Sequence, residues 1–198
     1  MFINEYIAKQ FANPRGLGGR IVTAVMNRQN AEMYDATEAL LHPQSHDTVL
    51  DIGCGNGIML SRIARTCDCR LIGIDISEDA IEVAKHRLTG KHAEFLCCPV
   101  DSMSIAAAMI DRAFTINTIY FWDNLAKGFD EIARVLKPSG IFIGTHYTNR
   151  SLEAYPHTQF GYKKYSEEEV ASAARSAGFE VKIQPIMNAR AYCLICRR

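Results

Sequence analysis

The chain of 198 residues is long enough for one sizeable globular domain, and its hydrophobic content of 48% excludes a disordered protein. Lysine plus arginine balance aspartate plus glutamate at 22 each, so no net charge favours nucleic acid or an anionic lipid surface as a partner. No apolar run approaches the roughly 18 residues of a membrane span, and the first residues lack the pattern of a signal peptide, so we expect a cytoplasmic protein.

Residues 1–45 stand apart from the rest of the chain. They contain a glycine-rich turn at residues 13–20 and a helical pattern over residues 21–41 that is interrupted near residues 27–30. We expect them to form a helical lid, the source of substrate specificity, over a main domain of residues 46–198. The two parts should make one compact unit.

From residue 47 onward, short apolar runs alternate with helical patterns. Strands are predicted at residues 47–52, 69–75, 93–100, 112–117 and 140–147. Helices are predicted at residues 58–65, 77–88, 125–136 and 166–178, with a short one after Asp101 or Ser102. This alternation is typical of a parallel sheet that is covered by helices on both faces.

Two further strands are predicted at residues 179–186 and 190–197, with no helix between them. They should form a hairpin, so one of the two runs antiparallel to the rest. The fold class is therefore α/β, with a doubly wound, Rossmann-like sheet of seven strands.

Seven cysteines in a chain without an export signal are expected to be reduced thiols. One pair has the C-x-x-C spacing of zinc ligands, but it lies in a strand-like run, where residues three apart point to opposite faces. We therefore expect small buried core residues and no metal site. The three close pairs are Cys67 and Cys69, Cys97 and Cys98, and Cys193 and Cys196.

Three glycines at every second position follow the first strand. The run VLDIGCGNG contains Gly53, Gly55 and Gly57, with Asp51 two residues before the first of them. A dinucleotide-binding turn would read G-x-G-x-x-G, but Ile58 stands where its third glycine belongs, and no Gly-Lys-Ser/Thr of a P-loop follows. The spacing therefore favours a bulky nucleoside that carries no phosphate.

This run resembles motif I of the class I S-adenosylmethionine-dependent methyltransferases, and further motifs follow in order. GIDIS (73–77) resembles the second-strand motif, PVDSM (99–103) the third-strand motif, and LKPSG (136–140) the turn before strand five. YSEEEVASAARSAGF (165–179) resembles a late helix of the small-molecule branch, the branch of methyltransferase types 11 and 25. The resemblance implies a catalytic domain over residues 46–198 and the sheet order 3-2-1-4-5-7-6, with strand seven antiparallel.

The resemblance also implies that the cofactor is S-adenosylmethionine, which becomes S-adenosylhomocysteine. Its methionine part would lie against the bare main chain of the glycine loop, where a β-carbon would collide. Asp51 would orient waters or the loop near the ammonium group, and the carbonyl of Asn117 would accept from it. Cys54 and Asn56 would contribute backbone alone, and a left-handed conformation is expected at Asn56.

The nucleoside would lie between the second and third strands. The carboxylate of Asp75 would accept both ribose hydroxyls, and Asp101 would accept from the adenine amino group, unless it is only a helix cap. The backbone N–H of Ser102 would face a ring nitrogen. Ile76 and Met103 would sandwich the adenine.

Methyl transfer needs an aligned nucleophile, with a proton acceptor only for some acceptors of the methyl group. His146 and Tyr120 are the candidates for such a group, and no catalytic residue is assigned. The aromatic run after strand four also fits ordinary packing between strand and helix. The residues expected at the acceptor are Tyr34, Tyr120, Trp122, His146 and Tyr147.

A small-molecule acceptor is expected, on a monomer or homodimer with no nucleic-acid or membrane partner. The residues after strand four, 117–120, lack the DPPY-type signature of nucleobase methyltransferases. Three alternatives stay open: a cofactor-binding module that has lost transfer, an arsenite methyltransferase with three converging thiols, and a nicotinamide oxidoreductase.

Overall fold

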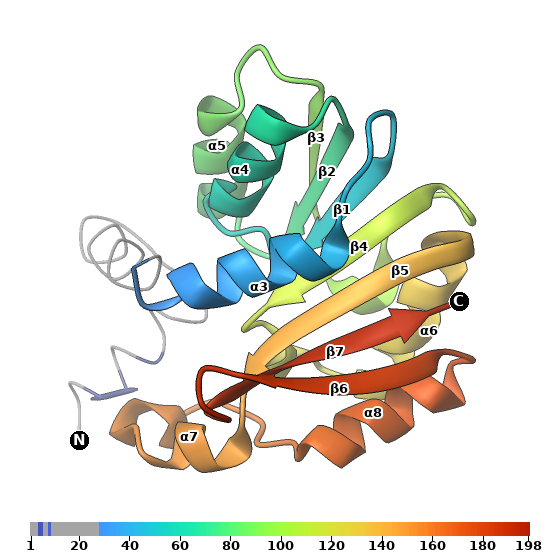
Figure 1. Ribbon diagram of the computed structural model, residues 1–198. Helices are drawn as coiled ribbons and strands as arrows, with labels where there is room; N and C mark the ends of the chain where they lie inside the picture. The colour runs from blue at the N-terminus through green and yellow to red at the C-terminus, as the bar shows by residue number, and fades with distance from the viewer. Residues whose placement is uncertain (1–3, 6–7, 9–27) are drawn as a thin grey trace.

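Seven strands form one mixed sheet in the order β3-β2-β1-β4-β5-β7-β6. The computed structural model describes residues 4, 5, 8 and 28–198, so the turn predicted at residues 13–20 lies outside the described residues. β7 pairs antiparallel with both β5 and β6, and the other neighbours pair in parallel. The α/β class, the strand order and the antiparallel seventh strand are confirmed (Figure 1).

The elements follow the predicted alternation along the chain. The strands are β1 (Thr48–Ile52), β2 (Arg70–Asp75), β3 (Ala93–Cys97), β4 (Ile110–Ile116), β5 (Leu136–Tyr147), β6 (Glu180–Ile186) and β7 (Ala191–Arg197). The helices are α3 (Ala31–Leu41), α4 (Ile58–Thr66), α5 (Glu78–Arg87), α6 (Leu125–Val135), α7 (Asn149–Glu153) and α8 (Glu167–Ser176). Short 3-10 turns are η1 (Val100–Ser102), η2 (Ile119–Phe121) and η3 (Pro156–Gln159). Over the described stretches, no helix combines the length and the apolar character of a bilayer span.

Side-chain caps set where several helices begin. Ser77 accepts from the backbone N–H of Ala80 at the start of α5, as predicted. Ser166 and Glu169 form the predicted capping box of α8, each side chain accepting from the other residue's backbone N–H. These caps satisfy amide groups that have no partner inside the helix.

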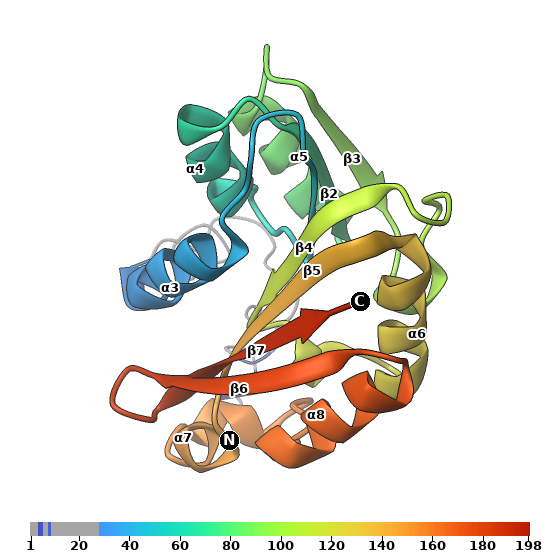
Figure 2. The ribbon, with the colours of Figure 1, turned by 45° about the vertical axis from the view of Figure 1, so that its right-hand side comes forward.

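Helices cover both faces of the sheet, so β1 at its centre is buried along its whole length. Figure 2 shows α3, α4 and α5 on one side and α6 and α8 on the other. Each face has its own hydrophobic cluster. One contains Leu60 of α4 and Phe114 of β4, and the other contains Phe129 of α6 and Phe142 of β5. In doubly wound sheets of this kind, ligands bind outside the carboxyl ends of the parallel strands.

Helix α3 is the described part of the predicted lid, and it packs directly on the sheet. Met33, Thr37 and Leu41 are completely buried. The Thr37 hydroxyl donates to the Met33 carbonyl at 2.7 Å and lies 2.7 Å from the Thr145 hydroxyl of β5. This helix therefore belongs to the core, whereas most of residues 1–27 lies outside the described residues.

The short helix predicted after the third strand does not form over residues 103–109. The Met103 amide donates to the Glu131 carboxylate at 3.0 Å. Arg134 donates to the carbonyls of Met103 and Ile105 at 3.0 and 2.7 Å. Because side chains of α6 take these backbone groups, the groups cannot enter a helical ladder.

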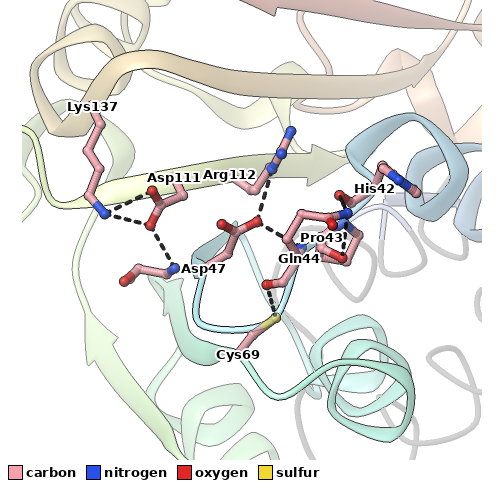
Figure 3. A network of polar contacts seen from close by, with 9 residues as sticks. His42, Pro43, Gln44, Asp47, Cys69, Asp111, Arg112 and Lys137 are labelled. Atoms are coloured by element: carbon pink, nitrogen blue, oxygen red, sulfur yellow. Dashed lines mark hydrogen bonds and ion pairs between the residues drawn. The ribbon is translucent and has the colours of Figure 1, made fainter.

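A polar network holds the amino ends of the strands together (Figure 3). Asp47, just before β1, pairs with Arg112 of β4 at 3.1 Å. Asp111 of β4 pairs with Lys137 of β5 at 2.7 Å and accepts from the Thr48 amide at 2.9 Å. Ion pairs thus join the amino ends of β1, β4 and β5, on the side of the sheet away from the glycine loop.

Candidate functional site

The three glycines after β1 all have positive φ, at +74°, +51° and +69° for Gly53, Gly55 and Gly57. The structure separates their roles. A β-carbon on Gly53 would collide with the Thr118 methyl, and one on Gly57 would lie 3.0 Å from the Ala84 β-carbon. A β-carbon on Gly55 would meet no atom of the described residues within 4 Å. The fold needs two of the glycines for close packing, whereas the third is not packed against the described part of the chain.

Asp75, at the carboxyl end of β2, fixes the loop. One carboxylate oxygen accepts from the Gly55 amide at 2.9 Å, and the other accepts from the Ser77 amide at 2.9 Å. Burial raises the pKa of Asp75, and these backbone hydrogen bonds oppose that rise. A carboxylate has about four lone-pair sites, so these backbone donors leave capacity for hydroxyl groups of a ligand.

A second carboxylate lies under the same loop. Asp51 is 4% exposed, and its pKa is raised by burial and then by the charge of Asp75. Burial, and then the charges of Asp51 and Asp75, also raise the pKa of the Cys54 thiol. No ion pair between described residues involves either aspartate. This corner therefore favours a cationic ligand group.

An apolar side chain is exposed beside these acids. Ile76 is 59% exposed directly after Asp75, and Asp101 on η1 is half-buried. Met103, predicted as the second wall around the adenine, is 5% exposed and packs within the core cluster of α6. Asp75, Ile76 and Asp101 thus lie at the carboxyl ends of β2 and β3, whereas Met103 is largely covered by protein.

Asn117, after β4, has a left-handed backbone with φ +58°. Its side-chain nitrogen donates to the Asn30 side-chain oxygen at 3.1 Å, and its side-chain oxygen accepts from the Tyr120 hydroxyl at 3.2 Å. The left-handed conformation predicted at Asn56 is wrong, because that side chain instead accepts from the Ile58 amide at the start of α4.

The aromatic residues predicted at the acceptor are mostly packed into the protein. Tyr120 accepts from the Tyr147 amide at 2.6 Å, and Trp122 donates to the Thr118 hydroxyl at 3.1 Å. Both side chains are buried, and so is Tyr34 on α3. Among this set only Tyr147 is half-exposed.

His146 is completely buried on β5. Its ring lies 5.9 Å from the Tyr120 ring and 5.9 Å from the Tyr192 ring, centroid to centroid. Neither ring nitrogen has a hydrogen-bond partner among the described residues. Burial lowers the pKa of His146 to about 3, so the imidazole is neutral at physiological pH and enclosed by aromatic rings.

A second aromatic group, not predicted from the sequence, lies on η2, on η3 and just after η3. The Phe121 ring lies 4.7 Å from the Tyr162 ring, and the His157 ring lies 6.0 Å from it. Lys163 donates to the Trp122 carbonyl at 2.6 Å and so holds this segment against η2. The aromatic-rich run YPHTQFGYKKY at residues 155–165 was the available signal.

The cysteines do not converge on the glycine loop. Cys193 and Cys196 both lie in β7, opposite Thr145 and Phe142 of β5, so they face the two sides of the sheet as predicted. Within the described ranges, no three His, Cys, Asp or Glu side chains are grouped to hold a metal ion. Three thiols for arsenite are therefore not gathered at this edge.

Comparisons with known proteins agree with this geometry. A family described as "Methyltransferase domain" matches residues 50–144. The uncharacterized methyltransferase YdaC of Bacillus subtilis (strain 168) is 27% identical over 157 residues, or 79% of this chain and 84% of that protein. A SAM-dependent methyltransferase structure from Aquifex aeolicus has a TM-score of 0.74 at 20% identity, over 86% of this chain and 92% of that one. The chain is thus similar to class I methyltransferases and has their fold.

Two further matches are to a longer protein and to a structure that shares the fold alone. The 24-methylenesterol C-methyltransferase 2 of Oryza sativa subsp. japonica is 28% identical over 72% of this chain, which spans only 44% of that relative. A chain in the complex between the Haloferax volcanii Trm112 methyltransferase activator and a methyltransferase has a TM-score of 0.84 at 19% identity. That match covers 98% of this chain and 97% of the other.

We predict that Gly55→Ala leaves the protein folded but weakens S-adenosylhomocysteine binding at least tenfold, because the new methyl group enters the space beside the loop that no described residue fills. The positive φ adds a strain of about 1–2 kcal/mol. Gly53→Ala, the matched variant, should lose more unfolding free energy because Thr118 must move. Calorimetric titration and urea unfolding measure the two effects; unchanged affinity in Gly55→Ala contradicts the prediction.

We predict that His146 lowers the free energy of unfolding of the protein in acid. The unfolded chain protonates this histidine below about pH 6.5, whereas the folded chain excludes the proton until about pH 3. Stability from this group is thus present above pH 6.5 and is lost on acidification, by about 1.4 kcal/mol per pH unit. Urea unfolding near pH 7 and pH 4.5 should show His146→Leu losing about 2–3 kcal/mol less than the parent. Parallel losses in the two proteins would count against it.

Proposed function

We propose that this protein is a methyltransferase that binds S-adenosylmethionine at the carboxyl ends of β1 and β2 and transfers its methyl group to a small molecule. The observation that carries this proposal is the space at Gly55, which no described residue fills, beside the carboxyl groups of Asp51 and Asp75. A ligand with two cationic centres and no phosphate fits a bare loop above buried acids. When bound, the cofactor supplies an electrophilic methyl group.

The residues around the loop have separate proposed roles in binding. Asp75 positions the Gly55 amide and offers its remaining lone pairs to the ribose hydroxyls. Ile76 provides an exposed apolar surface for the adenine, and Asp101 accepts from the adenine amino group. The Asn117 carbonyl, aimed by its left-handed backbone, accepts from the ammonium group together with waters held by Asp51.

The acceptor is proposed to meet the rings of Phe121 and Tyr162, which are half-buried beside η2. Aromatic faces favour an apolar or a cationic small molecule. The sterol methyltransferase relative supports an acceptor of this kind, although this chain spans less than half of its length.

A second candidate function is a cofactor-binding module without transfer. It is favoured by the burial of Tyr120 and His146, because neither proton-accepting candidate is exposed to a ligand. An acceptor that needs no deprotonation reconciles the same observation with catalysis. Turnover decides between the two.

Asp75→Asn should weaken S-adenosylhomocysteine binding by about 2–3 kcal/mol, because the charge-assisted hydrogen bonds to the ribose and to the Gly55 amide are lost. Asp79→Asn, on the exposed first turn of α5, is the matched control and should bind like the parent. Calorimetric titration measures both. Equal affinities in the two variants would remove Asp75 from the site.

Transfer of a labelled methyl group to a panel of apolar and cationic small molecules tests the function itself. The expected result is a methylated product that depends on S-adenosylmethionine and is lost in Gly55→Ala. Tight S-adenosylhomocysteine binding without product on the whole panel would support the binding module. Tighter binding of a nicotinamide dinucleotide would overturn both candidates.

A further inference from the structure

The backbone ladder between β4 and β5 stops one residue past the end of β4. The Asn117 amide donates to the Thr145 carbonyl at 2.9 Å, as a parallel ladder requires. The next bond of such a ladder would run from the Tyr147 amide to the Asn117 carbonyl. That amide instead donates to the Tyr120 hydroxyl at 2.6 Å and lies 3.4 Å from the Asn117 side-chain oxygen. The Tyr120 side chain therefore takes the donor that would otherwise occupy the Asn117 carbonyl.

The Asn117 carbonyl is consequently left for another donor. Among the hydrogen bonds between described residues, none ends on this carbonyl. Asn117 has its left-handed backbone just past the carboxyl end of β4, and β4 pairs directly with β1, which leads into the glycine loop. A carbonyl in this position suits a ligand group that donates hydrogen bonds, above all a cation.

The Asn117 side chain is also held by helix α3. Its nitrogen donates to the Asn30 side-chain oxygen at 3.1 Å and lies 3.3 Å from the Met33 sulfur. Asn30 is the N-cap of α3 and is 7% exposed, yet its side chain caps no amide of that helix. Asparagine is among the preferred capping residues, so the Asn30 oxygen bonds to Asn117 in place of its usual role. Helix α3 and the end of β4 are thereby joined through two buried amide groups.

Tyr120 acts here as a neutral hydrogen-bonding group and not as a base. Its ring is buried, and burial, and then the charge of Tyr192, raise the pKa of its hydroxyl, while the hydrogen bond from the Tyr147 amide opposes that rise. The hydroxyl keeps its proton at physiological pH. It accepts from the Tyr147 amide, and its own proton can reach the Asn117 side-chain oxygen or the Tyr147 carbonyl, each at 3.2 Å.

We propose that Tyr120 is a positioning residue for the proposed cofactor. By taking the Tyr147 amide, it leaves the Asn117 carbonyl to accept from the ammonium group of the methionine part. Asn30 supports the same carbonyl through the Asn117 side chain. The inference rests on the proposed function, which supplies the ammonium group. Tyr120 therefore sets the affinity for the methionine part and leaves the affinity for the nucleoside unchanged.

Two ligands separate this role from a merely structural one. S-adenosylhomocysteine carries the ammonium group, whereas 5′-methylthioadenosine is a thioether of the same nucleoside without the amino acid part. Tyr120→Phe keeps the buried ring and removes the hydroxyl, so the Tyr147 amide can return to the Asn117 carbonyl. Calorimetric titration should show S-adenosylhomocysteine binding at least tenfold more weakly, with methylthioadenosine within twofold of the parent. A damaged fold would weaken both ligands together.

Asn30→Ala tests the support from α3, and it carries the test alone if Tyr120→Phe folds poorly. It should weaken S-adenosylhomocysteine at least threefold and leave methylthioadenosine unchanged. Asn30→Asp keeps an acceptor oxygen for Asn117 and should restore at least the parental ratio of the two affinities. The matched control is Thr37→Val, which removes the 2.7 Å contact between the same helix and Thr145 of β5. It should lower the melting temperature and leave the ratio unchanged.

The outcomes separate this inference from the proposed function. If Tyr120→Phe weakens both ligands equally, or weakens neither, the positioning role is overturned while cofactor binding stands. A fall of the ratio in Thr37→Val as large as that in Asn30→Ala would overturn the role of Asn30. A parent that binds neither ligand would overturn the proposed function, and this inference with it.

Discussion

The proposed cofactor site depends on two hydrogen bonds, in which the carboxylate of Asp75 accepts from the amides of Gly55 and Ser77. It joins the end of β2 to the loop after β1 and to the start of α5. A half-buried carboxylate is costly unless backbone donors reach it, so its position and that of the loop fix each other. Burial and the charge of Asp75 raise the pKa of the nearby Asp51, so a cationic ligand group would favour its ionised form, whereas a phosphate would oppose it.

Much of the fold could be predicted because its signals are local. Apolar runs of strand length, helix caps such as Ser77 and Ser166, and the glycine run all lie within a few residues of the structure that they specify. The helix expected after the third strand failed for a non-local reason. Glu131 and Arg134, about thirty residues further along, take the backbone groups that such a helix would need.

The site was harder to predict at the level of single side chains. The three glycines look alike in sequence, and only the distant Thr118 and Ala84 distinguish the two that pack from the one that borders free space. Tyr120 follows β4 and His146 lies near the carboxyl end of β5, yet Tyr120 is fixed by the Tyr147 amide and His146 packs against the Tyr192 ring, and both side chains are buried. Burial of a residue depends on neighbours that local periodicity does not identify.

The position of β7 between β5 and β6 has a consequence for how the chain assembles. β6 is made before β7 but has no other strand to bond in this sheet. A nascent chain that has emerged only to residue 186 therefore carries two open strand edges, those of β5 and β6, each able to pair wrongly with another chain. Insertion of Ala191–Arg197 pairs with both edges at once, so the carboxyl-terminal half of the sheet is complete only after this last strand has been made.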